Sequence, residues 1–543
     1  MQSIMQYRRL RRDVEQDLAR TEHDALHQRP EKAGKLKSSS SSTAPMAETE
    51  TEQGDSTEQP RVPGVTLSRP TEEDGKVVFL VGWKVQDHNN PQEWSLSRKW
   101  TTMVACCLLS IALTIPTSID GPTQAAFDEH YGVSPMQGSM VTGIFLIGIA
   151  VGSLVSGPLS ETFGRNIIYF TAMILVMLFS MAKALAPNYG AALAFRFLNA
   201  LFAATPMTVA GGTVGDIWTP MQIPFGLPFI TFCAYAGPIL GTVIAAYTPE
   251  IGFAWADWIS MIIIGAALAL VLLVQPETYS PLLLEWRAKH LRDLTGDDRY
   301  QAEHASARSL GSRLAVNLYR PFSLAWTEPI ILVFTFYLIL LYFVLFTFLN
   351  GYPYIFTNVY GVSLSITFVI FAAMMPGVLI GLLMIPYIYH LTKKAAGKAA
   401  ASGQPLAPEV SLYWAMAGAS LFMPISLFWM GWTCYSDISI WSPIVASGFF
   451  GYALVCIFTT SYMYIIYVYL QYAASALGFM TFARYLIAGA LSPASIAMYE
   501  NLGPHWSLTI VGIIATLMAP VPFLLYKYGH KVRAMSKNVQ NKA

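Results

Sequence analysis

The residues of this chain that could do chemistry are a few charged side chains set among long apolar stretches. The segment GPLSETFGR, Gly157 to Arg165, places Glu161 and Arg165 between two apolar runs of about 20 residues. A tight polar turn that carries an acid and a base cannot lie in hydrocarbon, so it must lie at a membrane face. Its glycine and proline fix the turn, and its two charges can hold neighbouring helix ends. This combination indicates a gate, and therefore a carrier.

Enzymatic and metal-binding arrangements are not evident in the sequence. His390, His505 and His530 are scattered at expected loop positions, without a partnering nucleophile or base. The five cysteines fall in or at the ends of apolar runs and have no CxxC spacing, so they predict neither a disulfide framework nor a metal site. We therefore expect a protein without enzymatic activity, cofactor or metal.

The composition places the chain in the membrane class. Of its 543 residues, 54% are hydrophobic and 12% are charged, whereas soluble proteins have roughly a quarter charged residues. A net charge of +1 gives no general attraction to nucleic acid, and no such partner is expected. Residues 1–85 differ from the rest, with a basic cluster from Arg8, the run Ser38 to Ser42 and little hydrophobicity. They are predicted to be a disordered cytosolic tail.

Hydropathy predicts an all-α integral membrane protein with twelve transmembrane helices in two six-helix bundles. A window of about 19 residues detects apolar runs long enough to cross a core of ~30 Å. A polar interval after Pro276 divides the runs six and six, and its start is amphipathic enough for a short interfacial helix. The expected organisation is the tail at 1–85, bundles at 86–275 and 326–530, a cytosolic linker at 276–325 and a cytosolic C-tail at 531–543.

The distribution of lysine and arginine sets the expected orientation. Arg165, the 287–320 interval, Lys393, Lys394 and the Lys527–Arg533 segment all fall on one side of the predicted spans. The loops on the other side contain no Lys or Arg. By the positive-inside rule, both termini are expected in the cytosol. The plasma membrane is the expected location.

Several segments in order resemble one family. NPQEWSLSRKW precedes the first span, GPLSETFGR follows the second, and RFLNALFAA starts at Arg196. GPILG covers Gly237 to Gly241, PETYSPLLL starts at Pro276, RPFSLAWTEPI starts at Arg320, and YAASALGFMTFARYL starts at Tyr472. This series resembles the major facilitator superfamily, specifically fungal twelve-span carriers of the drug:proton antiporter type (polyamine and multidrug-like transporters). The resemblance runs from Asn90 to about Arg533.

The resemblance implies a secondary active transporter that works by alternating access. It implies export of a small amphipathic organic compound (a drug, toxin or secondary metabolite) by proton-coupled antiport. The expected partners are the substrate, protons and the lipid bilayer, and a monomer is expected. A facilitated uniporter, an importer of a small metabolite, or a non-transporting receptor with the same fold are the alternatives. Departures from the family pattern weaken the antiport reading: Asn166, Ala200, Thr242, Tyr467, and an eroded second-half gate that ends at His390–Lys394.

Candidate gate and coupling residues follow from these motifs. The expected cytosolic charge lock comprises Gly157, Glu161, Gly164, Arg165 and Asp216. Arg196 is deep in the fourth span, where it serves either coupling or a structural pair between helices. Arg484 and Lys183 are expected to snorkel toward the membrane faces, although Arg484 could contact substrate. Asp120 is expected to be a helix-end acid, with a protonatable vestibule acid as the alternative.

The sequence places no carboxylate firmly inside a span. A coupling proton would therefore have to use Asp120, Glu161, Asp216, Glu328 or a tyrosine–arginine network. Gly237, Pro238 and Gly241 form the antiporter-type motif of the fifth span, which either limits leakage or only kinks the helix. The predicted substrate cavity gathers aromatic and amide side chains that could stack on an amphipathic or cationic ligand: Asn199, Asn350, Tyr462, Tyr469 and Tyr472.

Overall fold

The structure is a computed structural model, and it describes residues 2–36, 62–68, 78–219, 221–302, 310–403, 406–469 and 473–536. The chain divides into two compact units. The smaller comprises Met1–Leu96 and Pro276–Arg308, and the larger comprises Ser97–Gln275 and Ser309–Ala543. Each unit has its own core and is treated separately below.

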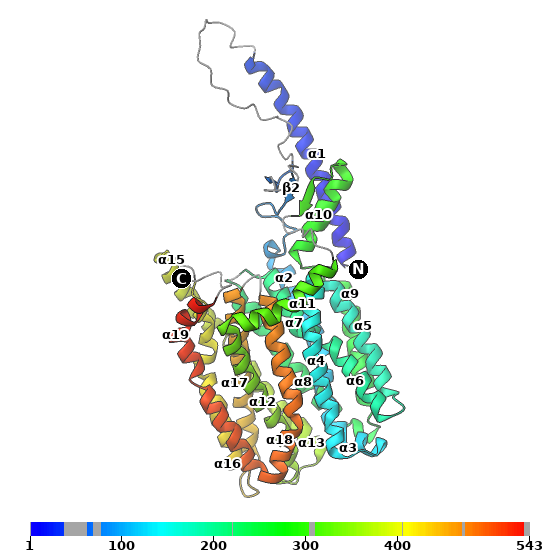
Figure 1. The fold of residues 1–543 in the computed structure, drawn as a ribbon, viewed down its shortest axis with the longest axis vertical. Helices are drawn as coiled ribbons and strands as arrows, with labels where there is room; N and C mark the ends of the chain where they lie inside the picture. Colours follow the sequence, from blue (N-terminus) through cyan, green and yellow to red (C-terminus); the bar gives the residue numbers. More distant parts are fainter. Residues whose placement is uncertain are drawn as a thin grey trace. The chain divides into compact units, whose positions relative to one another are not determined.

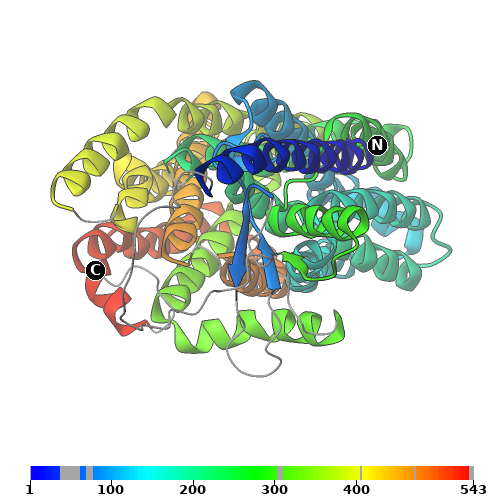
Figure 2. The same cartoon turned by 90° about the horizontal axis from the view of Figure 1, so that it is seen from above.

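The larger unit is a helical bundle (Figure 1). Its first half contains α2 (Leu96–Thr114), η2 (Ile115–Thr117), α3 (Asp120–Tyr131), α4 (Pro135–Phe163), α5 (Arg165–Ala184), α6 (Tyr189–Ala203), α7 (Thr205–Ile217), α8 (Ile223–Ala245), η3 (Thr248–Glu250) and α9 (Trp255–Val274). Its second half contains α11 (Leu310–Thr327), α12 (Pro329–Tyr352), η4 (Pro353–Thr357), α13 (Leu364–Ile370), η5 (Phe371–Met374), α14 (Met375–Leu383), α15 (Ile385–Ala401), η6 (Pro408–Leu412), η7 (Ala415–Ala419), α16 (Ser420–Thr433), α17 (Trp441–Tyr469), α18 (Ala473–Met518) and α19 (Val521–Met535). Figure 2 looks along the bundle, with most first-half helices on one side and the yellow-to-red second-half helices on the other.

Eleven helical stretches in the described ranges are long and apolar enough to cross a membrane. The last of them, Ser475–Met535, has 61 residues, whereas about 20 residues span the hydrocarbon core. Within it Gly503 leaves the helical conformation (φ 74°, ψ 172°) just before Pro504. In Figure 1 the chain reverses direction in this orange-to-red part. This stretch therefore supplies two crossings, and the predicted all-α fold with twelve transmembrane helices is confirmed.

Glycine allows close approach between helices in both halves. A Cβ atom added at Gly152 in α4 would lie 2.0 Å from the Leu201 carbonyl oxygen of α6. In the second half, a Cβ atom at Gly377 in α14 would lie 1.7 Å from the Gly448 carbonyl oxygen of α17. Small residues at such positions let helix backbones pack in direct contact.

The segment GPLSETFGR contains less turn than its sequence suggests. Helix α4 continues through Pro158 to Phe163, and α5 begins at Arg165. Only Gly164 (φ 95°) makes the reversal, in a conformation that favours glycine. Gly157 is thus a helical residue near the end of α4. The prediction of a nine-residue polar turn is corrected to a helix end with a single-residue hinge.

The smaller unit is folded where the composition predicts a disordered tail. Helix α1 covers Gln2–Leu36, and the three-stranded sheet contains β1 (Val65–Ser68), β2 (Val78–Val81) and β3 (Tyr300–Ala302). Strand β2 is antiparallel to β1, with Val65 opposite Val81, and parallel to β3, with Phe79 opposite Tyr300. A short helix, η1 (Pro91–Glu93), follows. The expectation of disorder over 1–85 is therefore wrong for the residues of that range that the structure describes.

The physical reason is that the linker completes the core of this unit. Val14 of α1 packs with strand residues and with Leu284, Ala288 and Leu291 of α10 (Ser280–Thr295). The N-terminal residues alone have too few apolar side chains to offset the entropy of ordering, but the linker supplies the rest. The amphipathic linker segment thus buries its apolar face in protein, where an interfacial membrane helix was expected. The tail and the first part of the linker form one unit, not two separate segments.

Candidate functional site

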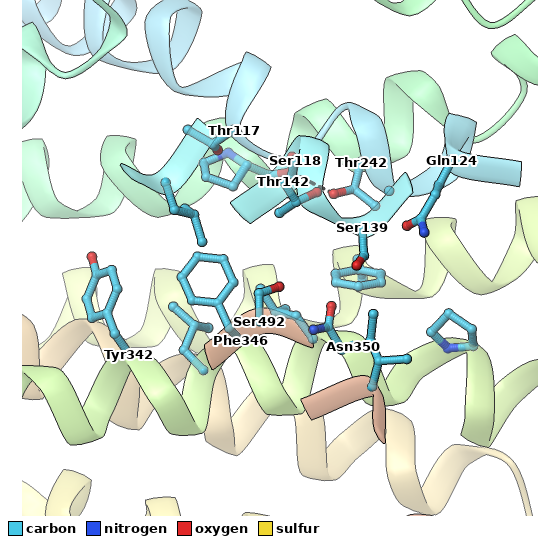
Figure 3. Close-up of a pocket in the computed structure, with 18 of the residues that line it drawn as sticks. Thr117, Ser118, Gln124, Ser139, Thr142, Thr242, Tyr342, Phe346, Asn350 and Ser492 are labelled. Carbon is cyan, nitrogen blue, oxygen red and sulfur yellow. Dashed lines mark hydrogen bonds between the residues drawn. The ribbon is translucent and has the colours of Figure 1, made fainter. Parts of the chain in front are cut away.

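A cavity with a volume of about 560 Å³ lies between the two halves of the bundle. Figure 3 shows two chemically different walls. The first-half wall presents hydroxyl groups of η2, α4 and α8: Thr117, Ser118, Ser139, Thr142 and Thr242. The second-half wall is mostly apolar, with rings and aliphatic side chains, and its labelled residues are Tyr342, Phe346 and Asn350 of α12 and Ser492 of α18. A site of this kind suits a ligand that has both an apolar body and hydrogen-bonding groups.

The cavity extends to the end of the bundle that is opposite the Gly164 turn. Gln124, Asn358 and Glu500 line it near the outer helix ends. Glu500 is the only charged side chain of its lining in the described ranges, and it accepts a hydrogen bond from the Tyr354 hydroxyl at 3.4 Å. At the other extreme the floor is formed by Met207, Tyr235, Phe458 and Tyr485.

Beyond the floor the two halves are in contact. The Ser153 hydroxyl of α4 reaches the Gly478 carbonyl oxygen of α18 at 3.5 Å. The rings of Phe225 in α8 and Tyr389 in α15 have centroids 4.4 Å apart. The cavity therefore opens at one end, whereas these contacts close the end that contains the Gly164 turn.

Arg484 of α18 lies directly behind the cavity floor. Its side chain is completely buried, and its guanidinium carbon lies 4.7–5.3 Å from the ring centroids of Tyr342, Phe458, Tyr462 and Tyr485. One Nη atom donates to the Tyr462 hydroxyl at 2.9 Å. Because the side chain is enclosed by rings at mid-helix, the expectation that Arg484 snorkels to the membrane face is wrong.

Four charged side chains form a buried network beside the hydroxyl wall. Lys183 of α5 lies 2.6 Å from Asp120 and 2.9 Å from Asp257 of α9. Arg196 of α6 pairs with the second oxygen of Asp120 and lies over the Phe145 ring. The side chains of all four residues are at most 10% exposed. Two acids and two bases at this depth neutralise each other, which is the condition for burying charge.

This network corrects three sequence-based expectations. Lys183 does not snorkel, since it bridges two carboxylates. Asp120 is the first residue of α3, but its side chain is buried and paired with Lys183 and Arg196, so it is not a loop acid at the helix end. Asp257 was missed, and it supplies a carboxylate inside a span. Its signal was an acid two residues after Trp255 at the start of a strongly apolar helix.

The gate segment supplies one ion pair of the expected lock. Arg165 Nε donates to Asp216 Oδ2 at 3.0 Å, and Arg165 Nη1 donates to the Ser160 hydroxyl at 2.6 Å. Glu161 is half-buried on the same helix end but makes no hydrogen bond or ion pair with any residue that the structure describes. Of the residues expected in the lock, Arg165 and Asp216 form the ion pair, next to the Gly164 turn.

The second half has its own buried charges near the corresponding end, of which Glu328 was a coupling candidate and Arg533 and Glu409 were not selected from the sequence. Arg533 of α19 lies 3.2 Å from Glu409 of η6, which also accepts from the Tyr464 hydroxyl at 3.4 Å. The Tyr469 hydroxyl donates to Glu328 at 3.1 Å. By contrast, Lys393 and Lys394 of the supposed second-half gate are exposed on α15.

The proposed cavity residues do not all meet at the cavity. Asn350 does, and its amide donates to the Ser495 hydroxyl at 2.7 Å. Asn199 instead bonds the Val176 carbonyl oxygen (3.0 Å) and the Ser180 hydroxyl (2.8 Å) between α5 and α6. Tyr462 and Tyr469 face Arg484 and Glu328, so they do not line the main cavity. Tyr472 lies outside the described residues.

The fifth-span motif positions the hydroxyl wall. A Cβ atom at Gly237 would lie 1.9 Å from Thr114 Oγ1, and one at Gly241 would lie 2.4 Å from the Ile115 carbonyl oxygen. These glycines bring α8 against α2 and η2. Pro238 lines the cavity, and its carbonyl oxygen accepts from Ser118 and from Thr242.

No group of three His, Cys, Asp or Glu side chains in the described part of the chain could hold a metal ion. The site therefore consists of an amphipathic cavity, a buried arginine behind its floor and paired charges between helices. A twelve-helix bundle with a central cavity between its halves is the architecture of a membrane transporter.

The sequence pattern of the Major Facilitator Superfamily matches residues 101–493. The chain belongs to this superfamily of membrane transporters. It is a transporter rather than an enzyme.

Two fungal relatives match nearly the whole chain. The chain is 43% identical to the MFS-type transporter kojT of Aspergillus flavus over 486 residues, which cover 88% of this chain and 86% of kojT. It is 36% identical to the uncharacterized transporter mfs2 of Schizosaccharomyces pombe, covering 85% and 84% of the two chains. Among solved structures, the proton:xylose symporter XylE superposes with a TM-score of 0.59 at 14% identity, over 80% of this chain and 96% of XylE. The last comparison supports the fold.

Proposed function

We propose that this protein is a secondary active transporter that exports a small amphipathic organic compound (a drug, toxin or secondary metabolite) by proton-coupled antiport. The observation that carries the proposal is the cavity of about 560 Å³ that both halves line. Hydroxyl groups on one wall and rings on the other match a compound that is partly polar and partly apolar.

Alternating access requires that the cavity be closed at one end at a time. The contacts beyond its floor, together with the Arg165–Asp216 ion pair, belong to the closed end. Breaking them while closing the Glu500 end would expose the same cavity to the other face. We place the Gly164 turn and both termini in the cytosol of a plasma-membrane monomer, on the charge asymmetry of the loops.

The network of Asp120, Lys183, Arg196 and Asp257 is our candidate for proton coupling. Two residues close to Asp120 in the chain, Ser118 and Gly121, line the cavity. A change in the charge of the Asp120 carboxylate would therefore alter the environment of a bound compound. Protonation of one acid would leave the network with a net positive charge and weaken one Lys183 contact. Such a change gives the two conformations different proton affinities, which coupling requires.

The test is flux in proteoliposomes with a panel of radiolabelled toxins, polyamines and fungal metabolites, with and without an imposed pH gradient. We expect gradient-driven transport of at least one compound by the wild type. The Asp257→Asn variant should retain exchange without a gradient but lose gradient-driven accumulation. A wild-type transport rate that is the same with and without the pH gradient would indicate a uniporter. Binding without flux for every bound compound would indicate a receptor. Uptake into cells, opposite to export, would indicate an importer.

A further inference from the structure

The cation of Arg484 has no counter-ion. It forms no ion pair with a described residue, and the Tyr462 hydroxyl is its only hydrogen-bond partner there. Its Nε and Nη1 groups are buried and have no hydrogen-bond partner among the residues that the structure describes. A buried charge is costly unless it is paired, and surrounding rings compensate it only in part.

Lys183, Arg196, Arg165 and Arg533 of the bundle are buried beside carboxylates, and buried Lys99 donates to the Gln222 side chain near the Trp218 ring. Lys183 contacts two carboxylates, Arg196 contacts Asp120, and Arg165 contacts Asp216. Arg484 is thus a buried cation at the centre of the bundle with no carboxylate partner among the described residues. Because Lys183 and Arg196 are paired with acids of the protein, a negative partner for Arg484 can come from a bound ligand.

The position of Arg484 indicates where a negatively charged partner would have to bind. Three of its four surrounding rings, those of Tyr342, Phe458 and Tyr485, also line the cavity. The guanidinium therefore lies one side-chain layer behind the floor. Charge interactions at this depth are weakly screened, so the floor is electrostatically positive. The single acid of the lining, Glu500, lies at the opposite, open end.

We infer that the compound carried by this cavity is an organic anion, or a weak acid bound in its ionised form, whose negative group lies at the floor, one side-chain layer from the Arg484 guanidinium. The ligand body would lie against the rings of α12, and its neutral polar groups would face the hydroxyl wall. This inference deepens the proposed function and rests on the same cavity. It replaces the cationic ligand that the tyrosines suggested, because Tyr462 already faces a cation of the protein.

The test is ligand-induced thermal stabilisation of the purified full chain in detergent. The probes are benzoate, salicylate and 2-naphthoate at millimolar concentration, each paired with its neutral amide, and benzylamine as the cation. We expect at least one acid to raise the melting temperature more than its amide and more than benzylamine does. The order of the three acids would further show how much of the cavity a ring fills.

The matched variants are Arg484→Met, which keeps the length of the side chain, and Lys393→Met, which removes an exposed positive charge of α15. Arg484→Met should abolish the acid-specific shift, and Lys393→Met should keep it. If Arg484→Met does not fold, the charge-retaining variant Arg484→Lys should fold and should keep the larger thermal shift with acids than with amides. Equal shifts for acids and amides, a larger shift for benzylamine, acid shifts that survive in Arg484→Met, or no shift with any acid would overturn the inference.

This outcome is separable from that of the proposed function. Acid binding that depends on Arg484, without flux in proteoliposomes, would keep the anionic site and reject transport. Gradient-driven flux of neutral or cationic compounds that is equal in wild type and Arg484→Met would keep transport and reject the anionic site.

Discussion

The ammonium group of Lys183 lies 2.9 Å from a carboxylate oxygen of Asp257, and the two residues are contributed by different helices, α5 and α9. The same ammonium lies 2.6 Å from Asp120 of α3. One cation therefore forms ion pairs with two helices that are remote from its own in sequence. Arg196 of α6 joins the network through its ion pair with Asp120.

Replacing one member of this network should destabilise the protein more than replacing two. Lys183→Met leaves two carboxylates facing each other, and loss of one buried partner typically costs about 3–5 kcal/mol. The double variant Lys183→Met with Asp257→Asn removes one charge of each sign and should recover part of that loss. Thermal unfolding in detergent measures both. A double variant as unstable as the sum of the two single variants would contradict the network.

The Arg165–Asp216 pair should bias the bundle toward closure at the Gly164 end. Arg165→Gln removes the ion pair, and each lost kcal/mol changes a two-state population about fivefold. In a background without native cysteines, a Gly478→Cys reporter near Ser153 should then be alkylated faster. The exposed Lys393→Gln substitution is the control and should leave the rate unchanged. Equal alkylation rates in the presence and absence of Arg165 would remove this residue from the gate.

Two glycines should respond oppositely to alanine. A Cβ atom at Gly377 would lie 1.7 Å from the Gly448 carbonyl oxygen, so Gly377→Ala must push α14 away from α17, at a cost of about 1–3 kcal/mol. Gly157, in helical conformation, has no atom within 4 Å of an added Cβ. Gly157→Ala should be neutral or stabilising by roughly 0.5–1 kcal/mol, because alanine loses less entropy in a helix. Melting temperatures decide, and a strong loss at Gly157 would reveal a role that packing does not explain.

The smaller unit should lose stability as the pH falls below about 6.5, the ordinary pKa of histidine. Burial of His290 on α10 lowers its pKa, with Arg11 and Lys289 acting in the same direction. The folded unit therefore favours the neutral ring, whereas the unfolded chain binds the proton more readily, so stability decreases below the unfolded pKa. Hydrogen exchange of α10 amides in the full chain, between neutral pH and mildly acidic pH, measures this.

The control for this pH effect is His290→Gln, which cannot titrate in that range. Its α10 amides should exchange with no extra acceleration at low pH, after correction for the intrinsic pH dependence of exchange. A wild type and a variant with the same pH dependence would show that His290 does not carry the effect.

The sequence by itself determined the class of protein and the number of membrane crossings. Hydropathy is a local property, since each span must be apolar over its own 20 residues whatever it packs against. A chain reversal within Gly157 to Arg165 was also readable, because a polar, glycine-containing stretch between two apolar runs has a local signature, although the reversal takes only Gly164. Family motifs added the transporter fold, which the comparisons confirm.

The pairing of charges was decided only by the tertiary structure. Lys183 and Arg484 look alike in sequence, as single bases inside apolar helices, and snorkelling was a reasonable expectation for both. In the fold, Lys183 meets carboxylates from α3 and α9, whereas Arg484 meets four rings and no acid that the structure describes. Which helices become neighbours depends on packing across the whole bundle, so spacing along one helix cannot reveal the partner. The folding of α1 with α10 had the same cause, because the core they share comes from segments more than 200 residues apart.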